Sequence, residues 1–98
     1  MESMNFSYPK ANKPVTSRAH VGVVASGDLE VLIEPAQTSG ASVSITTSVH
    51  GFQDTWKVVM DRFFNRFDKA VEITINDAGA TPGSVMLRLQ QAAEVLAQ

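Results

Sequence analysis

The chain has 98 residues, which is enough for one domain. Apolar residues make up 44% of it, a fraction that is normal for a globular protein and too high for a disordered one. The formal net charge is -2, so electrostatics give no reason to expect a nucleic acid or an anionic membrane as a partner. The sequence has no cysteine, which excludes disulfides, a thiolate nucleophile and cysteine metal sites.

No apolar run approaches the roughly 20 residues that a membrane span needs. The first residues, "MESMNFSYPKANKP", lack the basic region followed by an apolar one that marks a secretory signal. We therefore expect a cytoplasmic protein. Residues 1–19 are polar and contain two prolines, so they are expected to form an N-terminal arm, and residues 20–98 are expected to form a single domain.

Residues 20–25 are rich in valine, a strand former, and residues 29–34 alternate between apolar and mostly polar side chains. The turn residues "SGD" separate the two runs, so together they predict a β-hairpin. "ASVSITTSV", residues 41–49, alternates in the same way and predicts a third strand. "AVEITIND", residues 70–77, predicts a fourth.

Between these last two strands the spacing changes to three and four, which predicts an amphipathic helix over residues 52–67. Its expected apolar face consists of Phe52, Trp56, Val59, Met60, Phe63, Phe64 and Phe67. This face carries the only tryptophan and most of the phenylalanines, so it is expected to form most of the core.

A second helix is expected after "GATPG", with Thr81 as its cap and Pro82 in its first turn. Its apolar stripe consists of Val85, Leu89, Ala92 and Leu96. Alternation at residues 85, 87 and 89 leaves an alternative, in which residues 84–89 are extended and the helix begins only near Gln90. The predicted fold is α+β: a two-layer sandwich of a mainly antiparallel four-stranded sheet and two helices, in the order β-β-β-α-β-α.

Few residues suggest chemistry of their own. His20 and His50 have no second histidine or carboxylate at ligand spacing, so no metal site and no autonomous catalytic residue is predicted. Glu30 and Glu34 share a strand face and are expected to solvate it. "GATPG", Gly79–Gly83, resembles a phosphate loop, but a capped strand-to-helix turn explains it without a ligand.

Ser26 is the exception, because it lies at the expected tip of the hairpin, where its hydroxyl is exposed. Serine, glycine and aspartate are ordinary turn residues, so "SGD" has a purely structural reading. It also has what a modification site needs: Gly27 gives a modifying enzyme access to the backbone, and strands on both sides fix the position of the tip.

"RAHVGVVASGDLEVLIEP" and "INDAGATPGSVMLRLQQA" together resemble the acyl carrier (delta) subunits of bacterial malonate decarboxylase and, more distantly, the acyl carrier subunit of citrate lyase. The resemblance covers Arg18 to about Ala93, and "VVASGDLEV" and "GATPG" are its specific parts. The "DSL" motif of fatty-acid acyl carrier proteins is absent from the sequence, so their four-helix fold is not expected.

The resemblance implies that Ser26, in the turn context of Gly27 and Asp28, carries 2'-(5''-phosphoribosyl)-3'-dephospho-CoA through a phosphodiester. The thiol of that arm would hold malonyl and acetyl groups as thioesters and supply the sulfur that the chain itself lacks. The implied partners are the acyl carrier transferase and decarboxylase subunits, a malonyl transferase and a prosthetic-group transferase. The chain itself would be a non-catalytic carrier.

Two alternatives remain at this stage. In the first, the chain is an unmodified, non-enzymatic α+β interaction domain and "SGD" is only a turn. In the second, it is a small hydrolase that uses Ser26 as nucleophile, which requires His20 or His50 within hydrogen-bond reach. If Ser26 is not the attachment site, Ser84 beside "GATPG" is the next candidate.

Overall fold

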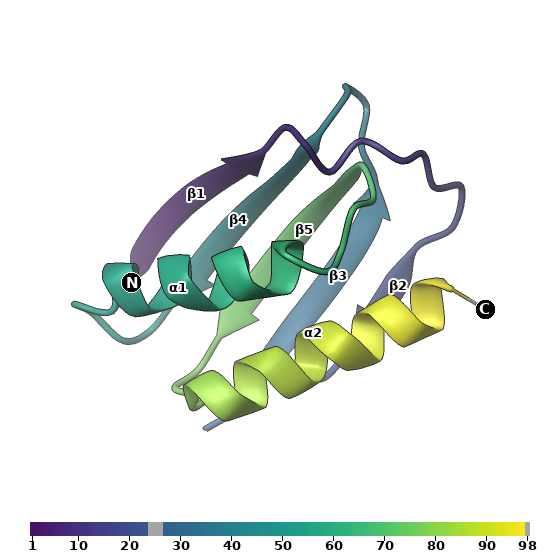
Figure 1. Ribbon diagram of the computed structural model, residues 1–98. Helices are drawn as coiled ribbons and strands as arrows, with labels where there is room; N and C mark the ends of the chain where they lie inside the picture. The colour runs from purple at the N-terminus through teal and green to yellow at the C-terminus, as the bar shows by residue number, and fades with distance from the viewer. Residues whose placement is uncertain (24–26, 98) are drawn as a thin grey trace.

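A computed structural model describes residues 1–23 and 27–97 of the chain (Figure 1). The described residues form one mixed sheet and two helices. The elements in chain order are β1 (Glu2–Tyr8), β2 (Ala19–Val21), β3 (Leu29–Pro35), β4 (Ala41–Thr47), α1 (Gln53–Phe64), β5 (Val71–Asp77) and α2 (Pro82–Leu96). Both helices cover the same face of the sheet, as Figure 1 shows, so the predicted two-layer α+β sandwich is confirmed.

The sheet itself differs from the prediction. Its five described strands lie in the order β1-β4-β5-β3-β2, so the prediction of four strands is wrong. Three neighbouring pairs are antiparallel, but the central pair, β4 and β5, is parallel. A parallel pair needs a crossover connection, and α1 supplies it. Alternation shows which face of a strand is buried but not the direction of its neighbour, so the sequence pattern did not reveal this pairing.

The additional strand lies in the segment that was expected to be a polar arm. Residues 2–8 form β1 and pair with β4 along its whole length, from Glu2 opposite Thr47 to Tyr8 opposite Ala41. Met4, Phe6 and Tyr8 alternate toward the core, and this period of two is the signal that the sequence analysis missed. The polar residues between them conceal it, because an edge strand with one solvated face needs few apolar side chains.

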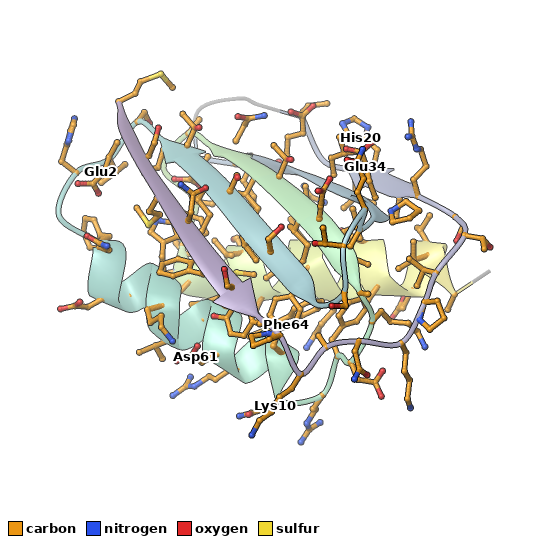
Figure 2. All side chains as sticks on the ribbon, turned by 90° about the horizontal axis from the view of Figure 1, so that it is seen from above. Glu2, Lys10, His20, Glu34, Asp61 and Phe64 are labelled. Carbon is orange, nitrogen blue, oxygen red and sulfur yellow. The ribbon has the colours of Figure 1, made fainter. Side chains whose placement is uncertain are left out.

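Tyr8 also ties β1 to the helix layer. Its hydroxyl donates to Asp61 Oδ1 at 2.8 Å, and its ring stacks on Phe64 with 4.1 Å between centroids. Lys57 Nζ donates to the same carboxylate oxygen at 2.6 Å. Figure 2 shows Asp61 and Phe64 on α1 below the end of the strand. Burial, reinforced by the hydrogen bond to Asp61, raises the pKa of Tyr8 well above its ordinary range.

The core lies between the sheet and the two helices. Trp56, Val59, Met60 and Phe63 of α1 are buried, as the helical spacing predicted. Phe67 and Phe64 are only partly buried and pack at its margin. The assignment of Phe52 to the buried face is wrong, since its side chain is 50% exposed and it serves as the N-cap of a helix that begins one residue later.

The second helix begins where the sequence indicated. Thr81 caps α2 by accepting a hydrogen bond from the Ser84 amide at 3.2 Å, and Pro82 occupies the first helical position. Residues 84–89 are helical throughout, so the extended alternative for this stretch is wrong. Leu87, which made the pattern look strand-like, is 55% exposed on the outer side of the helix.

Replacing Phe63 by alanine tests the core assignment. The side chain is buried and stacks on Phe67 at 4.8 Å, so its removal should lower the free energy of unfolding by about 3–5 kcal/mol. Urea unfolding measures the change. Phe52→Ala, at the N-cap position before the same helix, is the comparison variant and should cost clearly less than Phe63→Ala, because that side chain is 50% exposed. A loss below about 1 kcal/mol for Phe63→Ala would contradict the assignment.

Tyr8 should make stability depend on pH in the alkaline range. Because its pKa is raised in the folded state, its contribution is fully present below the unfolded value of about 10 and is lost as pH rises through the folded value. Urea unfolding from pH 8 to 11 should therefore show a steeper decline for the wild type than for Tyr8→Phe. Parallel curves for the two proteins would show that Tyr8 does not act in this way.

Candidate functional site

The candidate attachment residue lies in the connection between β2 and β3. These strands pair antiparallel, with Val21 opposite Val31, so the predicted hairpin is confirmed although its first strand ends well before residue 25. Ser26 itself falls outside the described residues. The two ends of its loop are described, at Gly22–Val23 and at Gly27–Asp28, and the site is built from them.

Two glycines form the ends of this loop. Gly22 has a φ of +83°, and a Cβ atom there would lie 2.3 Å from the backbone oxygen of Leu29, so only glycine fits. Gly27 has a φ of +78° with open space around it, so its constraint is the backbone conformation alone. Gly27 was predicted as a turn residue. Gly22 was not, although an isolated glycine inside a valine-rich run is a signal for such a bend.

Asp28 anchors the second end of the loop. Its carboxylate accepts two hydrogen bonds from the Arg88 guanidinium on α2, from Nε at 3.2 Å and from Nη2 at 2.8 Å, and one from the Leu29 amide at 2.7 Å. The hydrogen bonds from Arg88 are the largest cause that lowers the pKa of Asp28, followed by the bond from Leu29. Asp28 therefore stays ionised and its two-point contact with Arg88 persists at neutral pH.

The segment before α2 lies directly beside the loop. The Gly27 amide donates to the Ala78 carbonyl at 2.7 Å, and the Ala78 amide donates to the Asp28 carbonyl at 2.9 Å. These two bonds extend the β3–β5 ladder past Leu29, which is opposite Asp77. The "GATPG" segment thus begins immediately after Ala78, the residue that pairs with Gly27 and Asp28 of the "SGD" turn. The sequence had left open whether this segment lies near the turn or only shapes α2, and it does both.

Asp77 organises the turn that leads into α2. Its buried carboxylate accepts hydrogen bonds from the Thr47 hydroxyl at 2.8 Å and from the Gly79 and Ala80 amides at 3.1 and 3.0 Å. Thr47 Oγ1 in turn accepts from the Val49 amide at 3.1 Å. One carboxylate therefore joins the carboxyl ends of β4 and β5, and sequence analysis gave it no role.

Two pockets flank the segment of residues 78–84. An apolar pocket of about 340 Å³ lies between the first turns of α1 and α2, with Phe52, Trp56 and Val85 in its wall. A polar pocket of about 380 Å³ lies at the base of the Ser26 loop. The second pocket is lined by Gly27, Asp28, Ser84, Leu87 and Arg88. Ser84, the fallback attachment residue, thus lies close to the described end of the loop.

Neither histidine is among the described residues that line these pockets. His20 Nε2 is 2.8 Å from Glu30 Oε2 on the outer face of the sheet. The two residues are diagonal neighbours on paired strands, which spacing along the chain does not reveal. Glu34 pairs with Arg18 at 3.0 Å, and Figure 2 shows Glu34 beside His20 on this face. His50 is exposed in the connection before α1.

Neither a metal nor a membrane is suggested by the described residues. In residues 1–23 and 27–97 no three histidine or acidic side chains gather as metal ligands would. None of the described helices has the length and apolar character needed to cross a membrane.

The chain is similar to known proteins of one family over nearly its whole length. The family described as malonate decarboxylase delta subunit (MdcD) matches residues 16–96. The malonate decarboxylase acyl carrier proteins of Pseudomonas syringae pv. tomato and Azotobacter vinelandii are 48% and 44% identical, each over 96% of this chain and 95% of the relative. A chain in the crystal structure of a Pseudomonas malonate decarboxylase hetero-tetramer in complex with malonate matches with a TM-score of 0.91 and 45% identity, covering 98% of this chain and 99% of that one.

These relatives place the molecule among acyl carrier subunits, which are non-catalytic components of a larger enzyme. The chain belongs to the malonate decarboxylase delta subunit family.

Asp77→Ala tests the hydrogen-bond network beside the loop. It leaves the Gly79 and Ala80 amides and the Thr47 hydroxyl without their acceptor, so we expect a loss of about 1–3 kcal/mol in the free energy of unfolding. Asp77→Asn keeps one acceptor oxygen and should lose less. Thermal and urea unfolding measure both variants. Equal losses for alanine and asparagine would show that hydrogen bonding is not what Asp77 contributes.

Proposed function

We propose that this chain carries acyl groups as thioesters on 2'-(5''-phosphoribosyl)-3'-dephospho-CoA, attached through a phosphodiester to the Ser26 oxygen. The observation that supports this most is the anchoring of the residues next to Ser26. Gly27 and Asp28 are fixed by backbone bonds to Ala78 and by the two-point contact with Arg88, in a chain that belongs to a carrier family.

Hydrogen bonds hold the described base of the loop in one position on the protein. The Asp28–Arg88 contact and the Gly27–Ala78 bond attach the loop to α2 and to the end of β5, both of which belong to the packed core. A residue next to these anchors is held near the protein surface while a modifying enzyme approaches it from solvent. Gly27 leaves that approach open, because no atom of the described residues beyond its chain neighbours lies within 4 Å of where its Cβ would be.

The residues at the base of the loop fit a phosphodiester. Arg88 supplies a guanidinium, and Ser84 supplies a hydroxyl that accepts from Thr81 at 3.0 Å and keeps its own proton for donation. Asp28 is the only carboxylate among the described residues that line this pocket, and Arg88 neutralises it. When bound, the group would supply the thiol that a chain without cysteine lacks.

The implied partners act in sequence on the same arm. A prosthetic-group transferase attaches it, acyl carrier transferase and malonyl transferase subunits exchange its acyl group, and decarboxylase subunits remove carbon dioxide from the malonyl thioester. The hetero-tetramer in which the similar chain occurs supports the other decarboxylase subunits as partners. This chain contributes tethering, because a bound acyl group meets each active site at a high effective concentration.

An independent hydrolase is less well supported. It requires a histidine as base for Ser26, and His20 Nε2 instead faces Glu30 on the outer surface of the sheet. An unmodified interaction domain remains the alternative function, and the mass of the protein made in its native host separates it from the carrier. A carrier shows a covalent adduct on a fraction of the molecules, and an interaction domain shows none.

Ser26→Ala tests the attachment residue. The change removes one oxygen from a loop residue, so stability should change by no more than about 0.5 kcal/mol. The covalent adduct and malonate-dependent turnover of the assembled complex should both disappear, because alanine offers no oxygen for the phosphodiester. Intact mass spectrometry with peptide mapping follows the adduct, and unfolding and co-purification with the partner subunits follow folding and assembly.

Ser84→Ala tests the alternative attachment residue, since Ser84 lies in the neighbouring pocket and carries the same hydroxyl. It should retain the adduct. An adduct that survives Ser26→Ala and disappears in Ser84→Ala would move the site to Ser84. A Ser26→Ala protein that is folded, unmodified and fully active in the complex would exclude the carrier function.

A further inference from the structure

Arg88 reaches both ends of the Ser26 loop from the helix layer. Besides its two hydrogen bonds to Asp28 at one end, its Nε would lie 3.4 Å from a Cβ placed on Gly22 at the other end. Asp28 and Arg88 are 60 residues apart in the chain, so the contact is a product of the fold. Arg88 Nη1 also donates to Gln91 Oε1 at 3.0 Å, which fixes the plane of the guanidinium.

The Arg88 guanidinium can donate further hydrogen bonds beyond these contacts. Arginine carries five N–H groups, and the hydrogen bonds to Asp28 and Gln91 use three of them among the described residues. One N–H on each Nη atom is therefore available for another acceptor. The side chain is 30% exposed and lines the polar pocket of about 380 Å³, so a solvent-borne group can reach it.

Ser84 adds a third donor to the same pocket. It precedes Arg88 by four residues on α2, so both side chains lie on the same face of the helix. Its oxygen accepts from the Thr81 hydroxyl, which leaves the Ser84 proton free to point elsewhere. A fixed cation with two N–H groups and a nearby hydroxyl is a donor set that suits the oxygens of a phosphate ester.

The position of these donors relative to Ser26 indicates which phosphate of the prosthetic group they would contact. The Cα atom of a residue two positions before Asp28 lies within about 7.6 Å of the Asp28 Cα. A phosphodiester on the Ser26 oxygen would thus begin beside a pocket whose wall includes Gly27 and Asp28. The apolar pocket on the other side of residues 78–84 offers no cation among its described lining residues and does not suit this part of the group.

We propose that Arg88 and Ser84 bind the phosphodiester that joins the prosthetic group to Ser26. Arg88 donates to its non-bridging oxygens through the two remaining N–H groups, while Asp28 and Gln91 hold the guanidinium in position. This inference rests on the proposed function. It gives Arg88 a direct contact with the group, so its role extends beyond shaping the loop.

The test uses the modified full-length protein and phosphorus NMR. The phosphodiester resonance differs from that of the pyrophosphate further along the arm, which serves as an internal reference. In the wild type, the phosphodiester shift should differ between the folded protein and the same sample in urea. Arg88→Gln should abolish most of this difference, Arg88→Lys should retain part of it, and Ser84→Ala should reduce it. Arg62→Gln, an exposed arginine on α1, is the matched control and should leave it unchanged.

A second measurement compares unmodified with modified wild-type protein, so it does not require an Arg88 or Ser84 variant to accept the prosthetic group. The guanidinium resonances of Arg88, assigned by their absence in Arg88→Lys, should move between unmodified and modified wild-type protein. Those of Arg62 should not. Unchanged Arg88 resonances on modification, or a phosphodiester shift in modified Arg88→Gln identical to that of the wild type, would overturn the proposal.

Intact mass separates this failure from failure of the proposed function. An adduct on wild-type Ser26 together with unmoved Arg88 resonances rejects the Arg88 contact and leaves the carrier function standing. A wild-type protein from the native host with no adduct at Ser26 rejects both.

Discussion

The parallel pairing of β4 with β5 is the constraint on which the rest of this structure depends. Parallel neighbours cannot be joined by a short turn, so the chain must cross over, and α1 is the crossover. The crossover brings the carboxyl ends of both strands, and the helix starts that follow them, to one edge of the molecule. Thr47 and Asp77, the last residues of the two strands, meet there and share a buried hydrogen bond.

The remaining elements follow from this central pair. β3 runs antiparallel to β5, so β3 begins at the end of the sheet where β5 finishes. The loop that precedes β3 therefore emerges beside the turn that follows β5. α2 starts from that turn and extends back across the sheet, which carries Arg88 to within hydrogen-bond distance of Asp28. The described ends of the Ser26 loop, the "GATPG" segment and both helix starts therefore lie at one end of the sheet because the sheet is mixed.

Local patterns in the sequence predicted most of the elements but not their arrangement. The helical spacing predicted Trp56 and Phe63 as core residues, and Thr81 and Pro82 located the start of α2, because these signals act within a few residues. β1 was missed because Met4, Phe6 and Tyr8 alternate within a polar segment. The predicted strand–helix–strand order of residues 41–77 is compatible with a parallel crossover between β4 and β5, but alternation within each strand does not give their relative direction.

The motifs of the candidate site could likewise be predicted from local patterns, but their arrangement could not. "SGD" and "GATPG" could be recognised as motifs, and their adjacency could not, since it arises from the β3–β5 register. The His20–Glu30 contact depends likewise on the pairing of two strands. Arg88, the only basic residue of α2, could be read as a candidate for pairing with a carboxylate, but nothing in the sequence selects Asp28 as its partner.

The distance along the chain between Asp28 and Arg88 has a consequence for biosynthesis. Protein chains emerge from the ribosome from the N-terminus onward. The hairpin that contains the loop is made first, and the arginine that anchors its base, on α2, follows 60 residues after Asp28. A growing chain therefore exposes "SGD" before the loop has its native anchor. The anchored form requires α2 to have emerged and folded, so an enzyme that recognises it would leave shorter nascent chains unmodified.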